Sequence, residues 1–347
     1  MPRAVVLGGT GATGRATTRR LLAAGWSVQF TGRDASRAPG ELTDAGARFA
    51  RFERSMRFDV AAGTLELATV LGDGADLVVD CTCYTADHAR TMLPLLESIG
   101  SVVMISSKAV YADSYGNHSN SDVRPWFDGP VTEQQPTLAP RDGNYNSRGG
   151  YGPNKVAAER VLLDSGAPVS VLRPSKIHGI GASNPREWFF VRRVLDGREV
   201  VLLADHGSGI DHTSAATNIA ALIETVAPLT GSRILNIADP DAADVRHIAM
   251  TVAAHFGHRW SEVLVDGPAD NMLGWTPWNT IPPVILDTSA AVALGYRPVG
   301  SYGETVGEEL DWLASREGEL RADVTELSDP ALFDYAAEDA YLENLSR

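Results

Sequence analysis

Short apolar runs alternate with longer stretches of mixed polarity along the first two thirds of the chain. Each run is five or six residues long, which suits a buried parallel strand. The expected strands are residues 3–7, 26–31, 48–52, 76–81, 102–106, 168–173 and 233–237, and the clearest expected helices are 86–98, 152–165 and 213–227. This alternation predicts an α/β fold in which a parallel sheet is doubly wound, with helices on both faces.

A glycine-rich loop follows the first expected strand and precedes an expected helix that ends at Gly25. Its glycines permit a tight turn, a close approach of phosphate to the backbone, and close packing of helix on strand. The helix N-terminus would meet a pyrophosphate with free N–H groups and a favourable dipole. The loop therefore predicts a dinucleotide site whose cofactor-binding residues are Gly8, Thr10, Gly11, Ala12, Thr13 and Gly14.

The residues after the second expected strand bear on the choice of cofactor. An NAD site commonly carries an acidic residue roughly 20 positions past the glycine loop, where it binds the ribose 2′-hydroxyl. Here Gly32 stands at that point and Arg33 follows it. A guanidinium pairs well with a 2′-phosphate. We therefore favour NADP(H) with Arg33 as a contact, while Asp34 keeps NAD(H) as the alternative.

Ser107, Tyr151 and Lys155 are the candidate catalytic residues. A Tyr and a Lys four positions apart on a helix share one face at about 5–6 Å. Ser107 follows the fifth expected strand, so it belongs to the sheet edge where ligands bind in such folds. A phenol with a pKa of about 10 is a poor base at neutral pH, so it needs an adjacent positive charge that lowers this pKa. This set predicts a site that moves a hydride and a proton to or from one carbon.

In this order, the glycine loop, residues 106–111, the Tyr151–Lys155 pair and residues 172–179 resemble the extended short-chain dehydrogenase/reductases. More narrowly they resemble the NAD(P)-dependent epimerase/dehydratase family, over about residues 3–240. The resemblance implies a Rossmann-type domain with a smaller C-terminal substrate lobe. It implies that Tyr151 is the general acid/base, that Lys155 supports the phenol and binds the nicotinamide ribose, and that Ser107 orients the substrate oxygen. Further expected cofactor contacts, beside Tyr151 and Lys155 themselves, are Asp59, Val60, Thr82 and Pro174.

Three segments depart from that family pattern. Residues 112–150 form a long polar insert, which we interpret as a lid or substrate wall, with a surface insertion as the alternative. Lys176 and His178 either make the substrate pocket basic or find partners locally. Residues 211–218 stand where many relatives carry a strand ending in an aspartate pair, which argues against a standard nucleotide-sugar site.

We expect residues 1–174 and 205–240 to form the dinucleotide-binding domain, and residues 175–204 and 241–302 the substrate lobe. In that lobe Trp260, Trp275 and Trp278 either belong to the core or wall a ring-shaped ligand. Residues 303–347 form an acidic helical extension, which packs on the lobe or on a partner subunit. Its acidic residues, Glu309 among them, are expected to be solvated.

Charge and composition narrow the classes of partner. A net charge of −14 argues against nucleic acid, which needs a basic surface, and no apolar stretch suits a membrane span. Cys81 and Cys83 fit a reducing cytoplasm as buried thiols. His255 and His258 lack a third ligand, so no metal site is predicted. The expected partners are a small-molecule substrate and, for a homodimer, a second copy of the chain.

The resulting functional hypothesis is hydride transfer at a secondary alcohol or ketone carbon of a sugar-like or ring-shaped substrate. Net reduction and redox-neutral epimerisation or dehydration use the same residues, so the sequence leaves both open. The alternative is a cofactor-sensing regulator on the same fold, without catalysis. The presence of all three candidate catalytic residues favours the enzyme.

Overall fold

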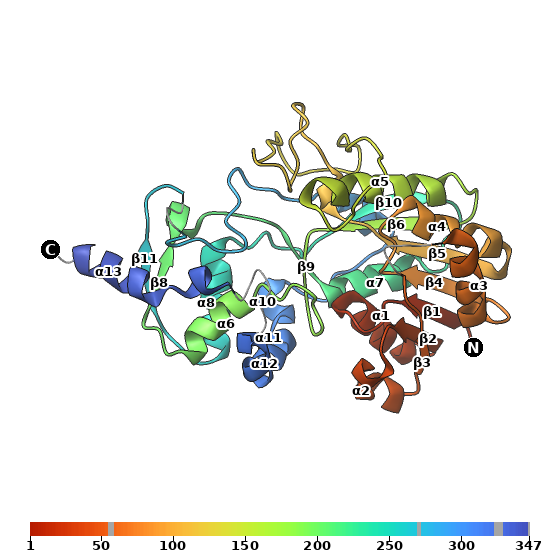
Figure 1. Cartoon of the computed structure of the whole chain (residues 1–347), viewed down its shortest axis with the longest axis horizontal. Helices are drawn as coiled ribbons and strands as arrows, with labels where there is room; N and C mark the ends of the chain where they lie inside the picture. Colours follow the sequence, from red (N-terminus) through yellow and green to blue (C-terminus); the bar gives the residue numbers. More distant parts are fainter. Residues whose placement is uncertain (55–58, 269–271, 323–328, 346–347) are drawn as a thin grey trace.

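The computed structural model describes residues 1–54, 59–268, 272–322 and 329–345 (Figure 1). Its larger domain is built on a parallel sheet of seven strands in the order β10-β6-β5-β4-β1-β2-β3. Every neighbouring pair in it is parallel. The strands are β1 (Arg3–Leu7), β2 (Ser27–Gly32), β3 (Arg48–Arg51), β4 (Ala75–Asp80), β5 (Ile99–Ile105), β6 (Val169–Pro174) and β10 (Arg233–Ile237). The predicted doubly wound α/β fold is confirmed.

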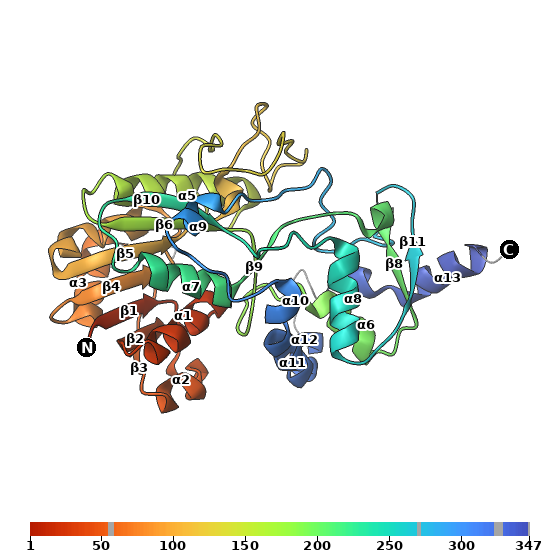
Figure 2. The ribbon, with the colours of Figure 1, turned by 180° about the vertical axis from the view of Figure 1, so that it is seen from behind.

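Alternate residues of each strand enter different layers of the core, as the two-residue period of a strand requires. In β1, Ala4 and Val6 face α1 (Ala12–Ala23) and α7 (Ala216–Val226), which Figure 2 shows side by side. Val5 and Leu7 face the opposite layer. That layer contains α3 (Val60–Leu71), α4 (Ala86–Arg90) and α5 (Arg148–Leu163). Burial on both faces explains why these strands read as continuous apolar runs.

Three predicted helices differ from the structure at their ends. The helix expected over 86–98 ends at Arg90 and is followed by a 3-10 helix, η2 (Leu93–Ser98), because Pro94 in its first turn has no N–H for an α-helical bond. The helix expected over 213–227 begins at Ala216, since Thr213–Ala215 is strand β9, paired with β7 (Lys176–His178). Helix α5 begins at Arg148 rather than residue 152, because the Ser147 side chain caps it by accepting from the Gly150 N–H.

The smaller lobe has its own aromatic core. Helices α6 (Trp188–Leu195) and α8 (Val245–His255) pack beside the parallel pair β8 (Val200–Leu203) and β11 (Ser261–Leu264). Trp188 and Trp278 are fully buried, and Trp278 stacks on Phe190 with ring centroids 5.9 Å apart. Trp260 and Trp275 pack against the same cluster. Of the two interpretations of these tryptophans, the structure supports the core.

The C-terminal extension packs on this lobe. It comprises α10 (Tyr302–Thr305), α11 (Gly307–Ser315), α12 (Glu317–Ala322), η6 (Pro330–Phe333) and α13 (Tyr335–Leu345). Leu310 and Phe333 join the cluster around Trp188. Arg193 of α6 donates to Glu338 of α13 at 2.7 Å, and both side chains are buried. The expectation that Glu309 is solvated is wrong, because Glu309 is 0% exposed.

Short elements complete the described fold. They are η1 (Ala35–Arg37), α2 (Gly40–Asp44), η3 (Lys108–Val110), η4 (Ala204–Gly207) and α9 (Ser289–Ala293). None of the described helices combines the length and the apolar character that crossing a bilayer would require.

Candidate active site

The glycine loop has the close contacts that a dinucleotide site requires. Gly8 has a positive φ of 81°, and a Cβ on Gly14 would lie 2.4 Å from the Gly8 carbonyl oxygen. Helix α1 starts at Ala12 with Gly11 as its N-cap, and no side chain caps the helix. The N–H groups of the first turn, from Ala12, Thr13 and Gly14, therefore face a place where an anion can accept from them. These residues fit the pyrophosphate of a dinucleotide.

The end of β2 leaves a guanidinium beside the loop. A Cβ on Gly32 would lie 2.7 Å from Thr10 Cγ2, so the strand end and the loop are in direct contact. Within the described residues the exposed Arg33 side chain makes no hydrogen bond or ion pair. The Asp34 carboxylate accepts from the Ser36 N–H at 2.9 Å and from its hydroxyl at 2.8 Å. Asp34 thus caps η1, whereas Arg33 is free to meet a ligand.

The other predicted cofactor contacts lie at the same sheet edge. Thr82 follows β4, and its Cγ2 lies 2.6 Å from where a Gly8 Cβ would be. Pro174 ends β6 and is buried. Asp59 caps α3 by accepting from the Ala62 N–H at 2.9 Å, with Val60 as the first residue of that helix. Of these four residues, Thr82 is the one that contacts the glycine loop directly, and the roles of Asp59, Val60 and Pro174 stay predictions.

Arg54 also lies at this edge of the sheet, but the sequence did not identify it as a site residue. Its Nη1 lies 2.6 Å from Asp80 Oδ2 and 3.3 Å from the Thr82 hydroxyl, and its side chain is 3% exposed. Its Nε and Nη2 are buried and have no hydrogen-bond partner among the described residues. No sequence pattern predicts the ion pair of Arg54 and Asp80, because Asp80 looks only like the polar last residue of an apolar strand.

The structure brings the three candidate catalytic residues together. Ser107 follows β5, and its Oγ accepts from the Ala109 N–H at 3.1 Å. The Ser107 side chain lies close enough to the Tyr151 hydroxyl to act to lower the pKa of that phenol. Lys155 Nζ donates to the carbonyls of Cys83 at 2.7 Å and Ile105 at 2.8 Å. An ammonium has three donors, so one remains for a ligand.

Burial raises the pKa of the Tyr151 phenol, whereas the Ser107 side chain and the nearby Arg186 guanidinium act to lower it. Lys155 Nζ lies 5.9 Å from the centre of the Tyr151 ring. Arg186 precedes α6, so the smaller lobe supplies a second cation to this phenol. The sequence did not identify Arg186, because it lies far from Tyr151 along the chain and no local pattern shows that the two side chains are close.

Aromatic side chains surround Lys155. Its Nζ lies 4.5 Å from the ring centre of Tyr84, which stacks on Tyr145 with centroids 5.1 Å apart. Tyr84 and Tyr151 have centroids 6.4 Å apart, and His88 meets Tyr145 edge-on. Burial and the Arg54 charge lower the pKa of His88 to about 4, so its imidazole is neutral at pH 7. The sequence analysis missed Tyr84 and His88.

The insert over 112–150 is tied to the sheet edge. The Asp113 carboxylate accepts from the N–H groups of Tyr115, Asn117 and Trp126 at 2.8–3.0 Å. Asn236 at the end of β10 donates to the Val131 carbonyl at 2.8 Å. These bonds favour a built wall over a loose surface insertion, and the insert contributes Tyr145 to the aromatic group. Its role as a lid stays a prediction.

The two basic residues after β6 have local partners. His178 Nε2 lies 2.9 Å from Asp239 Oδ2, and Lys176 Nζ lies 3.2 Å from Asp211 Oδ2. Lys108, next to Ser107, forms an ion pair with the same Asp211. Burial, with Arg186 and Arg124 close by, lowers the pKa of Lys176 to about 7. One carboxylate thus faces two lysines beside Ser107, and burial lowers the pKa of both lysines.

The predicted absence of a metal site concerned His255 and His258. His255 pairs with Asp311 at 2.7 Å, and His258 lies 2.8 Å from the Arg198 carbonyl oxygen. Both histidines therefore have a partner of their own.

The profile of the NAD dependent epimerase/dehydratase family matches residues 4–238. The chain therefore belongs to this family of NAD-dependent enzymes. Among curated proteins, none matches the sequence.

Solved structures share the fold. A dTDP-glucose 4,6-dehydratase from Bacillus anthracis, in complex with NAD, has a TM-score of 0.66 at 15% identity, over 92% of this chain and 98% of that one. MoeE5 in complex with UDP-glucose and NAD has a TM-score of 0.64 at 19% identity, over 91% and 99%. The UDP-N-acetylglucosamine 4-epimerase from Bacillus cereus has a TM-score of 0.64 at 18% identity, over 91% and 100%.

The glycine loop gives a test of the cofactor site. A Gly14→Ala variant places a Cβ 2.4 Å from the Gly8 oxygen and 2.5 Å from the Gly9 Cα, so the loop must shift. We expect NAD(P)H to bind at least about 10-fold more weakly, a loss of about 1.4 kcal/mol, by fluorescence titration. The matched control is Gly40→Ala, whose Cβ meets nothing within 4 Å. Equal affinity in both variants would contradict the assignment of the loop.

Proposed function

We propose that the protein transfers a hydride at a secondary alcohol or ketone carbon, with Tyr151 as general acid/base. The observation that carries the proposal is the convergence of Ser107 and Tyr151 beside Lys155, whose Nζ lies 5.9 Å from the centre of the Tyr151 ring. Bound nicotinamide supplies or accepts the hydride. The chain's own residues bind the substrate oxygen and move its proton.

Each catalytic residue has a distinct task. The Ser107 hydroxyl orients the substrate oxygen, and the Tyr151 phenol gives it a proton in reduction or takes one in oxidation. The third donor of Lys155 would hold the nicotinamide ribose, since its other two bind the carbonyls of Cys83 and Ile105. The Ser107 hydroxyl and the charge of Arg186 favour the ionised phenol, which partly offsets its burial.

The cofactor is NAD(P), and we propose a preference for NADP. Arg33 supports it, because this exposed guanidinium stands at the end of β2 without a partner among the described residues. Solved structures of the same fold contain NAD, so NAD remains the alternative. The same residues serve net reduction and redox-neutral epimerisation or dehydration.

The substrate would be a sugar-like or ring-shaped molecule that carries an anionic group. Lys108 and Lys176 share Asp211, with Arg186 and Arg124 nearby, so basic side chains outnumber the carboxyl groups beside Ser107. An acidic group on the substrate would restore the balance. Among proteins of this fold, MoeE5 binds UDP-glucuronic acid as well as UDP-glucose.

The alternative is a regulator that senses its cofactor without catalysis. A regulator needs the glycine loop but has no use for a phenol, an ammonium and a hydroxyl arranged around one point. The complete set favours the enzyme. The protein would act in the cytoplasm, where Cys81 and Cys83 stay reduced, and a homodimer is its expected assembly.

Removal of the Tyr151 hydroxyl tests the chemistry. A Tyr151→Phe variant should lose roughly 10²-fold or more of kcat while its cofactor affinity stays within about 2-fold, because only the proton-transfer group is lost. Turnover can be followed by NAD(P)H absorbance on the best substrate from a screen of alcohols and ketones. A Tyr115→Phe control, at a residue that is 87% exposed, should keep full activity. Full activity of Tyr151→Phe would refute the mechanism.

Cofactor choice can be measured by calorimetry. The wild type should bind NADPH more tightly than NADH by about 1–3 kcal/mol, the scale of a hydrogen bond to a charged group. Arg33→Ala should remove most of this difference. Arg37→Ala, also on the exposed surface near β2, should leave it intact. If the wild type binds both cofactors equally, the NADP preference is wrong.

The anionic substrate group can be tested with matched pairs of compounds. Cyclic secondary alcohols should be better substrates as carboxylic acids than as the corresponding primary alcohols. Lys176→Met should reduce this preference at least about 10-fold in kcat/KM, while Lys108 still pairs with Asp211. The control is Arg148→Met, at a side chain 70% exposed and 3.8 Å from Asp122. Equal turnover of acids and neutral partners by the wild type would exclude the proposed anion.

A further inference from the structure

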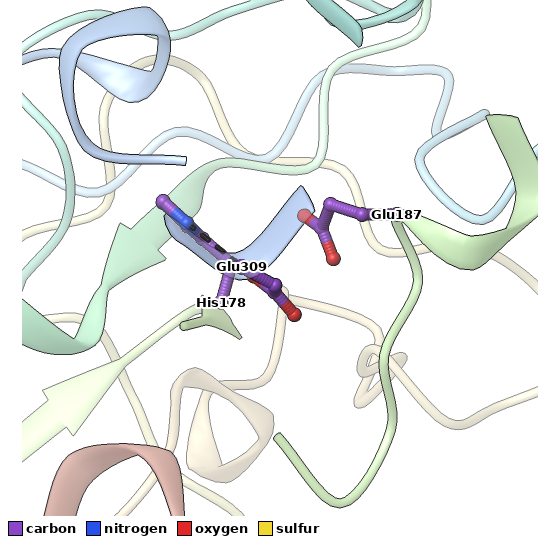
Figure 3. A group of neighbouring side chains, drawn as sticks. All are labelled: His178, Glu187 and Glu309. Carbon is purple, nitrogen blue, oxygen red and sulfur yellow. Dashed lines mark ion pairs between the residues drawn. The ribbon is translucent and has the colours of Figure 1, made fainter. Parts of the chain in front are cut away.

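Three buried side chains from distant parts of the chain converge in one cluster (Figure 3). His178 ends β7, Glu187 immediately precedes α6, and Glu309 lies in α11 of the C-terminal extension. Their exposed fractions are 1%, 2% and 0%. One ring nitrogen of the histidine and one oxygen of each carboxyl group lie within 4.8 Å of one another.

The two carboxyl groups form no close ion pair with Lys or Arg of the described residues, although the Arg186 charge acts on both and His178 Nδ1 lies 3.9 Å from Glu309 Oε2. No Lys or Arg nitrogen among the described residues lies within 4.0 Å of either one, as the ion pairs of the structure show. Nearby Arg186 donates instead to the carbonyls of Ile177 and Asn184, both at 3.5 Å. A buried unpaired carboxylate costs several kcal/mol. Some further positive charge or proton must therefore stabilise this place.

Two ligand atoms here are also without hydrogen bonds. His178 Nδ1 and Glu309 Oε1 are buried and have no hydrogen-bond partner in the part of the chain that the structure describes. The distance from His178 Nδ1 to Glu309 Oε2 is 3.9 Å, too long for a hydrogen bond. The Oε2 atom accepts from the Gly179 N–H at 2.5 Å, which fixes the carboxyl group beside His178.

The imidazole is oriented as a metal ligand would be. Its Nε2 lies 2.9 Å from Asp239 Oδ2, and in the tautomer with the proton on Nε2 the Nδ1 lone pair is available to an ion. Asp239 also accepts from the Thr213 hydroxyl, the Ala215 N–H and the Asn218 amide, and these hydrogen bonds stabilise its ionised form. A carboxylate behind a histidine fixes the tautomer and the ring of metal-binding histidines.

We propose that His178 Nδ1, Glu187 and Glu309 bind one divalent transition-metal ion. An imidazole with two carboxylates suits Zn²⁺ or Mn²⁺, whereas Mg²⁺ and Ca²⁺ prefer oxygen ligands only. Around an ion with bonds of about 2.1 Å the ligand atoms stand about 3–4 Å apart. If the glutamate side chains rotate so that their carboxyl oxygens move by about 1 Å, the three ligand atoms reach the separations that such an ion requires.

The ion would have a structural role. It would join β7, the start of α6 and α11, and thereby fasten the C-terminal extension to the larger domain. Gly179, next to His178, is in close contact with that domain, since its Cβ position lies 2.9 Å from Ala216 Cβ and 3.7 Å from Ala12 Cβ. Ala12 starts the helix of the glycine loop. This inference does not depend on the proposed catalytic activity.

The competing explanation is a single proton shared by Glu187 and Glu309. The two explanations differ in the effect of Glu309→Gln. A glutamine would replace a shared proton with its own amide donors, so the variant would be as stable as the wild type or more so. If the site binds a metal, the same variant loses a ligand and with it the added stability that the ion gives to the wild type.

The test uses the full-length protein. After it is incubated with ZnCl2 or MnCl2 and gel-filtered, we expect about one ion per chain by mass spectrometry. Its thermal midpoint should rise with the metal and fall after dialysis against EDTA. Glu309→Gln should lose both the ion and the response to metal.

Glu308→Gln is the matched control, because this neighbouring side chain is 67% exposed and pairs with Arg19. It should bind the ion and respond to it like the wild type. Two outcomes would overturn the proposal. One is a wild-type protein that retains no ion and whose midpoint ignores both metals, and the other is Glu309→Gln with wild-type metal content.

Discussion

The carboxylate of Asp239 holds the two parts of the molecule together. It stands just beyond β10, is 1% exposed, and accepts from His178, Thr213, Ala215 and Asn218. Burial alone would favour its neutral form, yet His178 and these hydrogen bonds lower the pKa of Asp239 to about 2. The charged carboxylate thereby fixes β7 and β9, the strand pair at the junction of the two parts (Figure 1).

Asn218 extends this network to the C-terminal half. Its amide donates to the Gly300 carbonyl at 2.8 Å, and its oxygen accepts from the Val299 N–H at 2.6 Å. The next helices, α10 and α11, start immediately beyond and place Glu309 beside His178. A single buried acid thus connects the sheet, the smaller lobe and the acidic extension. The extension is part of the folded core of the molecule.

Charge is distributed unevenly in this acidic protein. The chain carries a net charge of −14, yet the edge beside Ser107 gathers Lys108, Lys176 and Arg186 around one aspartate. A little away from them, Glu187 and Glu309 form the opposite arrangement, with carboxyl groups in excess. Because both places are buried, neither can rely on solvent to screen its charge. Such places are where a protein of this fold can acquire ligands of its own.

The sequence by itself determined the sheet, the glycine loop and the proximity of the candidate catalytic residues. Strands buried on both faces must be apolar throughout, and a turn that holds phosphate must be glycine-rich, so both features are visible locally. Tyr151 and Lys155 were found for the same reason, since four positions on one helix fix their proximity. Ser107 was found because parallel strands end at a common edge.

Only the tertiary structure decided which distant side chains meet. Arg54 with Asp80, Tyr84 with Tyr145, and His178 with Glu309 are separated by many residues, and no periodicity links them. Glu309 reads as one more acid on a solvated helix, and only the packing of α11 buries it. Local patterns report the period of an element and the conformations its backbone allows. The partners of a buried charge depend on how the elements pack, which the sequence does not show locally.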